Sequence, residues 1–199
     1  MKNLILAGTY LLFTACSNNA HSQNTVAETG GIAKEPGQPA RTTIIYSSKH
    51  GATEKVANMI AERIAEGNDV TLISLADVAM PDISSYDKVI LGTSIYMGKP
   101  RDEMKKFTGK KEATFTGKVV GLFVCGGEVN PDKRKRELGK AYPDSLHDIA
   151  IAEGFMGGEY NFERMSSFER KAMKMRAKVN ETTSFIDYGA IEVFADKMK

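Results

Sequence analysis

Residues 42–66, TTIIYSSKHGATEKVANMIAERIAE, join a short apolar run to a segment in which apolar residues recur every three or four positions. Residues 42–46 are β-branched and apolar, which predicts a buried strand. Residues 53–66 are predicted to form an amphipathic helix, capped by Thr53 and ended by Gly67. Its buried face is expected to contain Val56, Ala57, Ile60, Ala61 and Ile64.

The rest of the chain repeats this alternation of strand and helix. Apolar runs predict further strands at residues 70–73, 88–92, 118–124 and, interrupted by glycines, 150–160. Helices are predicted at residues 100–107, with Pro100 in the first turn, and at 131–141, 166–179 and 188–197. Strands separated by helices favour an α/β domain, with a parallel sheet covered by helices on both faces. In such sheets the loops after the strands bind ligands.

Composition excludes several classes of protein. The 199 residues are 42% hydrophobic and 26% charged, which indicates a folded chain. A net charge of +2, with both signs well mixed, argues against a nucleic-acid partner. Two cysteines and three histidines without metal-ligand spacing argue against a disulfide scaffold and against a metal site.

The N-terminus has the pattern of an export signal. Lys2 precedes an apolar run at residues 4–13, too short to span a membrane. The following Ala15-Cys16 resembles the lipobox of bacterial lipoproteins, which implies that Cys16 is acylated. Cleavage after Ser22, giving a secreted or periplasmic protein, and an N-terminus that is simply disordered or buried are the alternatives. We expect a membrane-anchored protein of the cell envelope.

This interpretation divides the chain into three parts. Residues 1–16 form the signal peptide that ends at the acylated cysteine. Residues 17–41 are rich in Ser, Asn, Gln, Thr, Gly and Pro and lack apolar periodicity, so they are expected to form a disordered polar tether. Residues 42–199 form the folded domain.

Three loops after predicted strands contain the candidate ligand-binding residues. The first loop contains Ser48, Lys49, His50, Gly51, Ala52 and Thr53. Its hydroxyls, its glycine and the N–H groups of the following helix predict an anion cradle, although a capped turn that binds nothing has the same pattern. The second loop contributes Thr93, Ser94, Ile95 and Tyr96, and Tyr96 could lie flat against a planar ligand. The third contributes Cys125, Gly126 and Gly127, whose glycines let a ligand approach the backbone. A lone thiol next to an apolar strand is more often a small core residue than a reactive group, and this is the alternative for Cys125.

These loops, in this order, resemble those of the flavodoxin family over residues 42–199. Residues 48–53 match the family's phosphate loop, Ser/Thr-x-Thr-Gly-x-Thr, with His50 in place of the middle Thr. The resemblance implies a flavodoxin-like doubly wound, five-stranded parallel sheet of order 2-1-3-4-5. It also implies that flavin mononucleotide (FMN) is the cofactor, with its phosphate on Ser48, Thr53 and the amides between them. The second and third loops would then border the isoalloxazine ring.

A narrower likeness links the chain to the branch of flavodoxins that contains menaquinone-dependent protoporphyrinogen oxidase. It rests on residues 92–99, 157–159, 168–175 and 186–188. The likeness implies an FMN-dependent oxidoreductase that passes electrons between an organic donor, such as a porphyrinogen, and a quinone-type acceptor. An exported flavodoxin-type electron carrier and a non-redox binding module are the alternatives. Carrier flavodoxins are strongly acidic, whereas this chain has a pI of about 8.4. No residue pair stands out as catalytic.

The predicted helix at residues 166–179 belongs to a basic segment. Residues 164–178 contain six Lys and Arg residues against one acid, Glu169. The residues expected to face the core or a membrane are Phe168, Ala172, Met175 and Val179. Lys171, Lys174 and Lys178 fall on another face, where they would attract anionic lipid headgroups or substrate carboxylates. A solvated helix face is the alternative.

Overall fold

Five strands form the parallel sheet at the centre of the molecule. We describe a computed structural model, which covers residues 38–176 and 178–199. The strands are β1 (Ala40–Ser47), β2 (Asn68–Ser74), β3 (Lys88–Tyr96), β5 (Val119–Cys125) and β6 (Ala150–Phe155). They lie in the order β2-β1-β3-β5-β6, and each neighbouring pair is parallel. Counted without β4, which only pairs with β3 in a hairpin, this is the predicted order 2-1-3-4-5.

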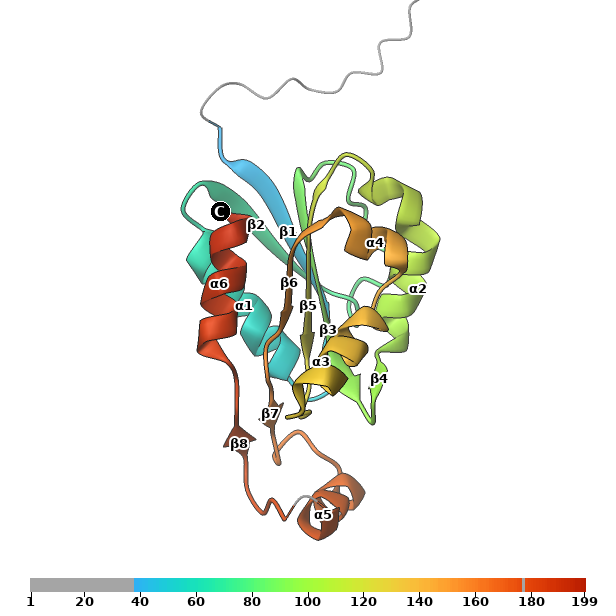
Figure 1. Cartoon of the computed structure of the whole chain (residues 1–199), viewed down its shortest axis with the longest axis vertical. Coiled ribbons are helices and arrows are strands. Elements are labelled where there is room, and N and C mark those ends of the chain that lie inside the picture. Colours follow the sequence, from blue (N-terminus) through green and yellow to red (C-terminus); the bar gives the residue numbers. More distant parts are fainter. Residues whose placement is uncertain (1–37, 177) are drawn as a thin grey trace, which may run out of the picture. The chain divides into compact units, whose positions relative to one another are not determined.

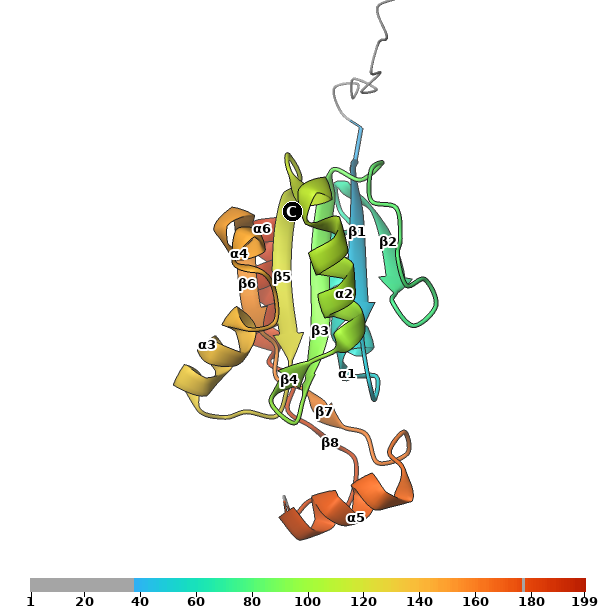
Figure 2. The ribbon, with the colours of Figure 1, turned by 90° about the vertical axis from the view of Figure 1, so that its right-hand side faces the viewer.

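Helices cover both faces of the sheet (Figures 1 and 2). One face packs against α1 (Ala52–Ile64) and α6 (Tyr188–Met198). The other is covered by α2 (Asp102–Lys111), the 3₁₀ turn η1 (Glu112–Phe115), α3 (Pro131–Gly139) and α4 (Asp144–Ile149). The predicted doubly wound α/β domain is therefore confirmed.

Each layer has its own hydrophobic core. Phe123 and Phe194 meet edge to face on the α1–α6 side, with ring centroids 6.0 Å apart. Phe107 and Phe115 do the same on the α2 side, also at 6.0 Å. The five apolar residues predicted on the α1 face are all buried, so that prediction is confirmed.

The start of α1 differs from the prediction. Gly51, and not Thr53, is the N-cap residue, with φ +95°, and no side chain of the described residues caps the helix. Thr53 lies within the first turn and is fully buried. The left-handed backbone at Gly51 moves the cap two residues earlier, because only glycine adopts that conformation without a steric cost.

The predicted helix start at Pro100 is wrong. β3 continues to Tyr96, and Met97 and Gly98, both at positive φ, form a two-residue turn. The chain then folds back as β4 (Lys99–Pro100), which pairs antiparallel with the end of β3. This hairpin delays α2 to Asp102.

The predicted broken fifth strand becomes two separate elements. β6 ends at Phe155, and Gly157 turns the chain at φ +66°. β7 (Glu159–Tyr160) then pairs antiparallel with β8 (Thr183–Ser184), apart from the main sheet. Between β7 and β8 the chain extends beyond the carboxyl ends of the parallel strands (Figures 1 and 2).

This extension contains α5 (Ser167–Arg176), which ends before the predicted Val179. Phe168 and Met175 are exposed, so the expectation that they could face the core is wrong for both. The helix lies beyond the carboxyl ends of the strands and not against a face of the sheet (Figures 1 and 2). A membrane-facing role for Phe168 and Met175 stays a prediction.

The predicted signal peptide, Cys16 and most of the predicted tether lie outside the described residues. β1 begins at Ala40, two residues before the expected start of the domain. In the described ranges, none of the helices combines the length and the apolar composition needed to cross a membrane.

Candidate functional site

The first predicted loop connects the carboxyl end of β1 to α1. The Gly51 N–H donates to Ser48 Oγ at 3.0 Å, which shapes residues 48–51 into a tight turn. The Thr53 hydroxyl is buried beside the Cys125 thiol, a weak hydrogen-bonding group, and has no oxygen or nitrogen partner among the described residues. Since a buried hydroxyl with only a weak partner is costly, this group at an uncapped helix start is suited to a ligand.

The second predicted loop is the end of β3. Thr93 is buried, and its Oγ1 accepts from the Arg101 N–H at 3.3 Å, which connects the end of β3 to the residue before α2. Ser94 Oγ is buried and lacks a hydrogen-bond partner within the described part of the chain. Tyr96 carries the Lys49 ammonium over its ring, with Nζ 3.2 Å from the ring centroid. The first two loops are therefore in direct contact.

The third predicted loop follows β5. Cys125 is buried in the core, where desolvation raises the pKa of its thiol to about 12, so the side chain stays a neutral thiol. Gly126 lies against Ile95, since a Cβ added to it would stand 3.2 Å from Ile95 Cβ. Gly127 lies under Tyr160, whose hydroxyl would be 2.2 Å from such a Cβ. Only the backbone of this loop is available to a ligand.

The structure thus brings all three loops together at the carboxyl edge of the sheet. Lys49 meets Tyr96, and Ile95 meets Gly126. Two buried hydroxyls lie there: Ser94 has no partner in the described part of the chain, and Thr53 lies beside the Cys125 thiol. The binding role of the thirteen predicted residues stays a prediction. Within residues 38–176 and 178–199 there is no group of three acidic, His or Cys side chains placed to hold a metal ion.

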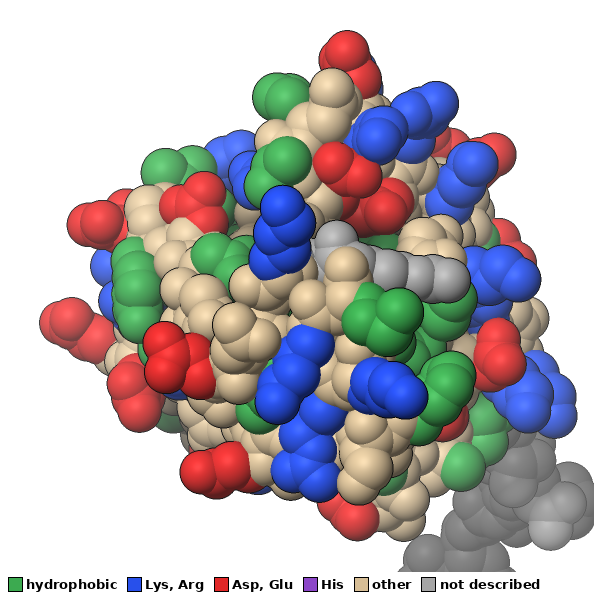
Figure 3. All heavy atoms as spheres, turned by 90° about the horizontal axis from the view of Figure 1, so that it is seen from below, with side chains coloured by type: hydrophobic (Ala, Val, Ile, Leu, Met, Phe, Trp, Pro, Cys, Tyr) green, Lys and Arg blue, Asp and Glu red, His purple; other side chains and the backbone are tan. Residues whose placement is uncertain are grey.

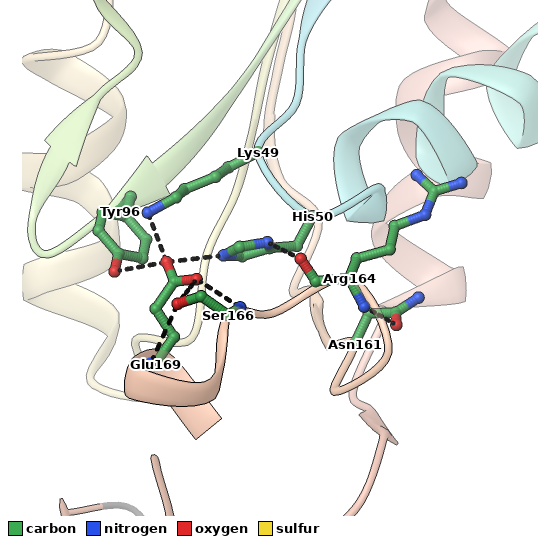
Figure 4. Close-up of polar contacts among 7 residues, drawn as sticks. All are labelled: Lys49, His50, Tyr96, Asn161, Arg164, Ser166 and Glu169. Atoms are coloured by element: carbon green, nitrogen blue, oxygen red, sulfur yellow. Dashed lines mark hydrogen bonds and ion pairs between the residues drawn. The ribbon is translucent and has the colours of Figure 1, made fainter. Parts of the chain in front are cut away.

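Sequence reasoning missed Glu169 as a member of this site (Figure 4). Its Oε1 lies 2.7 Å from Lys49 Nζ and accepts from the Tyr96 hydroxyl at 3.0 Å. His50 Nε2 lies 3.3 Å from the same oxygen, too poorly aligned for a hydrogen bond. The hydrogen bonds from Lys49 and from the Ser166 N–H hold the pKa of this carboxyl far below its usual range.

A local signal for this residue was present in the sequence. Ser166 and Glu169 have the Ser-x-x-Glu spacing of a capping box. The Ser166 N–H and Oγ both donate to Glu169 Oε2, at 3.0 and 2.9 Å, and the Glu169 N–H donates to Ser166 Oγ at 3.3 Å. The capping box predicts the start of α5, but not the contact with Lys49.

The segment before α5 also lies against the first loop. The Arg164 guanidinium covers Gly51, where an added Cβ would stand 2.4 Å from its Nη1, and it pairs with Glu54 at 2.9 Å. The Arg164 carbonyl accepts from His50 Nδ1 at 3.2 Å. Together with α1 this segment borders a polar groove of about 250 Å³. Residues 161–169 thus form an additional wall beside the phosphate loop.

Known proteins resemble this chain over partial lengths. A flavodoxin from Clostridium beijerinckii is 38% identical over 84 residues, which cover 40% of this chain and 60% of that protein. Protoporphyrinogen IX dehydrogenase (quinone) from Escherichia coli strain K12 is 28% identical over 97 residues, which cover 47% of this chain and 53% of that enzyme. The chain thus spans about half to three-fifths of the length of these curated relatives.

The fold and the family are shown by two further comparisons. A short-chain flavodoxin associated with a non-canonical PDU bacterial microcompartment superimposes with a TM-score of 0.55 at 17% identity, covering 79% of this chain and 95% of that one. The model of the flavodoxin domain family matches residues 43–187, from the first strand to the start of the last helix. This match includes all three loops. The chain belongs to the flavodoxin family.

Proposed function

We propose that the chain binds FMN and transfers electrons between an organic donor and a quinone-type acceptor. The observation that carries the proposal is a pair of buried hydroxyls beside the uncapped start of α1: Ser94 lacks a hydrogen-bond partner among the described residues, and Thr53 has only the weakly bonding Cys125 thiol there. FMN is the cofactor of the flavodoxin family, and its isoalloxazine ring supplies the redox chemistry when bound. The protein then needs only to bind the cofactor, orient it and limit access to it.

The residues present fit the phosphate end of FMN. The hydroxyls of Ser48 and Thr53 and the N–H groups of the loop between them are the donors that a phosphate requires. The positive end of the α1 dipole further favours a dianion at this position. Ser94 and the backbone of Gly126 and Gly127 are left to contact the ring system.

Replacing Thr53 with alanine should weaken FMN binding about 10- to 100-fold, because a hydrogen bond to a charged group contributes about 1.5–3 kcal/mol. Riboflavin, which lacks the phosphate, should bind the variant and the unchanged protein equally. Titration followed by flavin fluorescence measures both affinities. Thr43→Ala is the matched control, since Thr43 is another buried threonine, whose hydroxyl has no partner in the described chain, but it lies within β1. Equal affinity of the unchanged protein for FMN and riboflavin would contradict the assignment of the phosphate loop.

The choice of donor and acceptor is the finer part of the proposal. The match to the protoporphyrinogen enzyme supports a porphyrinogen donor and a quinone acceptor. A flavodoxin-type electron carrier is the second candidate, supported by the match to the Clostridium flavodoxin. The FMN-loaded chain should oxidise protoporphyrinogen in the presence of a menaquinone analogue, seen as porphyrin fluorescence. Porphyrinogen left unchanged, together with rapid electron exchange with a redox protein, would favour the carrier.

A membrane surface is the partner favoured by one end of the molecule, which is formed by α5, the β3–β4 turn and the loop after β5. Four large apolar side chains there are the most exposed of the described part: Phe168 (80%), Val129 (79%), Met97 (78%) and Met175 (74%). They lie on α5, on the β3–β4 turn and on the loop after β5, next to the flavin loops. Lys171 and Lys174 of α5 are exposed as well. Seen from this end, apolar and basic side chains adjoin (Figure 3), as in proteins that bind the surface of anionic membranes.

An acylated Cys16 would hold the domain close to the membrane, in an envelope-anchored lipoprotein. Replacing Cys16 with serine should move the chain from the membrane fraction to the soluble fraction, as measured by cell fractionation. The further change of Lys171 and Lys174 to glutamine should lower binding of the soluble protein to anionic vesicles about 10- to 30-fold, at about 1 kcal/mol per lysine. Changing Lys110 and Lys197, exposed in the last turns of α2 and α6 at the opposite edge of the sheet, should have no such effect. A soluble unchanged protein that retains Met1 would contradict the anchor.

A further inference from the structure

One carboxylate connects the two loops that are predicted to contact the phosphate and the ring of FMN. Glu169 Oε1 contacts Lys49 of the first loop at 2.7 Å and Tyr96 of the second at 3.0 Å. Glu169 itself belongs to α5, outside both loops. Its other oxygen is fixed by the capping box with Ser166, so the first oxygen is held in a defined position.

The contact with Glu169 also fixes the position of the Lys49 ammonium. The ammonium is held between the carboxylate and the ring of Tyr96, at 3.2 Å from the ring centroid. Stacked planar groups need the same few ångströms above the ring. A flavin ring can therefore stack on this face of Tyr96 only after Lys49 has moved, and Lys49 moves only when its contact with Glu169 is lost.

The ion pair between Lys49 and Glu169 is partly exposed to water, which weakens it. The side chains of Lys49 and Glu169 are 27% and 18% exposed, so water screens their attraction in part. The Arg164–Glu54 pair, which holds the same segment against α1, is more exposed still. A closed arrangement of this kind lowers the apparent affinity for a ligand by the fraction of molecules that are open.

We propose that Glu169 is an affinity-determining residue of the flavin site: as an internal anion it competes with FMN for Lys49, and by holding Lys49 over the ring of Tyr96 it keeps the flavin from that face. The proposal rests on the proposed function, because it assigns Glu169 a role toward FMN. The phosphate adds to the competition, since a dianion and a carboxylate beside the same ammonium repel one another. α5 is thereby coupled to the flavin: it is docked while Glu169 holds Lys49, and it is released when FMN enters.

The test is the affinity of the full chain for FMN, with Glu169→Gln as the variant. Glutamine removes the charge but can still close the capping box, so α5 keeps its start. FMN should bind this variant about tenfold more tightly and associate faster, which corresponds to the loss of one partly exposed charge-assisted contact. Hydrogen exchange without flavin should be faster in residues 164–176 of the variant. Glu181→Gln, an exposed position in the same extension, is the control for net charge and should change neither measurement.

The outcomes separate this proposal from the proposed function. Weaker or unchanged FMN binding by Glu169→Gln overturns the competition, while the binding of FMN itself still stands. Binding by Glu169→Gln but not by the unchanged protein supports the proposal in its strongest form. If neither protein binds FMN, the proposed function fails, and the role of Glu169 fails with it.

Discussion

Replacing Gly157 with alanine is expected to lower the free energy of unfolding by about 3–4 kcal/mol, through backbone strain and lost hydrogen bonds. Gly157 has φ +66°, and an added Cβ would stand 2.2 Å from the Phe185 carbonyl oxygen. The two backbone segments would have to separate at this point. That separation breaks the hydrogen bonds from Phe185 N–H to the Gly158 carbonyl and from Asp187 N–H to the Met156 carbonyl, at 2.9 and 3.0 Å.

Urea denaturation of the variant and of Gly67→Ala distinguishes the two causes. Gly67 also has a positive φ, +84°, but an added Cβ there meets no described atom within 4 Å. Its replacement should cost only the strain of the left-handed conformation, about 1–2 kcal/mol. Equal losses at both positions would show that the close approach of Gly157 to Phe185 does not constrain the fold.

Replacing Phe123 with alanine should have an effect of similar size, about 3–5 kcal/mol, as for other large aromatic residues truncated in a core. Phe123 is fully buried and lies between β3 and α6. Its ring stands directly above Gly92, where an added Cβ would be 2.1 Å from the ring, and it meets Phe194 edge to face. On β5 the neighbours that face the same core are Gly121, which lacks a side chain, and the small Cys125, so the strand offers little to fill the space that the ring leaves.

Phe168→Ala is the matched control for this loss. Its ring is 80% exposed, so truncation should change the free energy of unfolding by no more than about 0.5 kcal/mol. The comparison uses the same denaturation experiment on both variants. A large loss at Phe168 would mean that α5 packs more tightly than the structure shows, and a small loss at Phe123 would argue against the arrangement of the first core.

The elements predictable from sequence are those in which burial repeats with a regular period. The apolar face of α1 and the runs in β1, β3 and β5 identify a doubly wound sheet because each element must bury that face. The ends of the helices and strands were less predictable. Met97, a residue that rarely takes positive φ, gives no sequence signal for the turn that places Pro100 in a strand. The cap at Gly51 depends on a left-handed backbone conformation. The sequence pattern instead favours Thr53 as the cap, because a threonine hydroxyl is a common helix cap.

The candidate site also has a part that could be predicted from the sequence and a part that could not. Its loops follow strands, so their meeting at one edge was predictable once the sheet was known. The part that no local pattern shows is the contact between Lys49 and Glu169, which are 120 positions apart and meet only through the extension between β7 and β8. The side chain of Cys125 was predictable locally. A lone thiol next to an apolar strand is more often a small core residue than a reactive group, and its side chain points into the core.

The β7–β8 ribbon places Tyr160 opposite Thr183, so residues 161–182 leave the domain and return to it at a single point. The entropy of closing such a stretch rises only slowly with its length. Insertions, deletions and exchanges between these two residues therefore leave the sheet and its two cores untouched, while they alter the wall beside Lys49 and Tyr96.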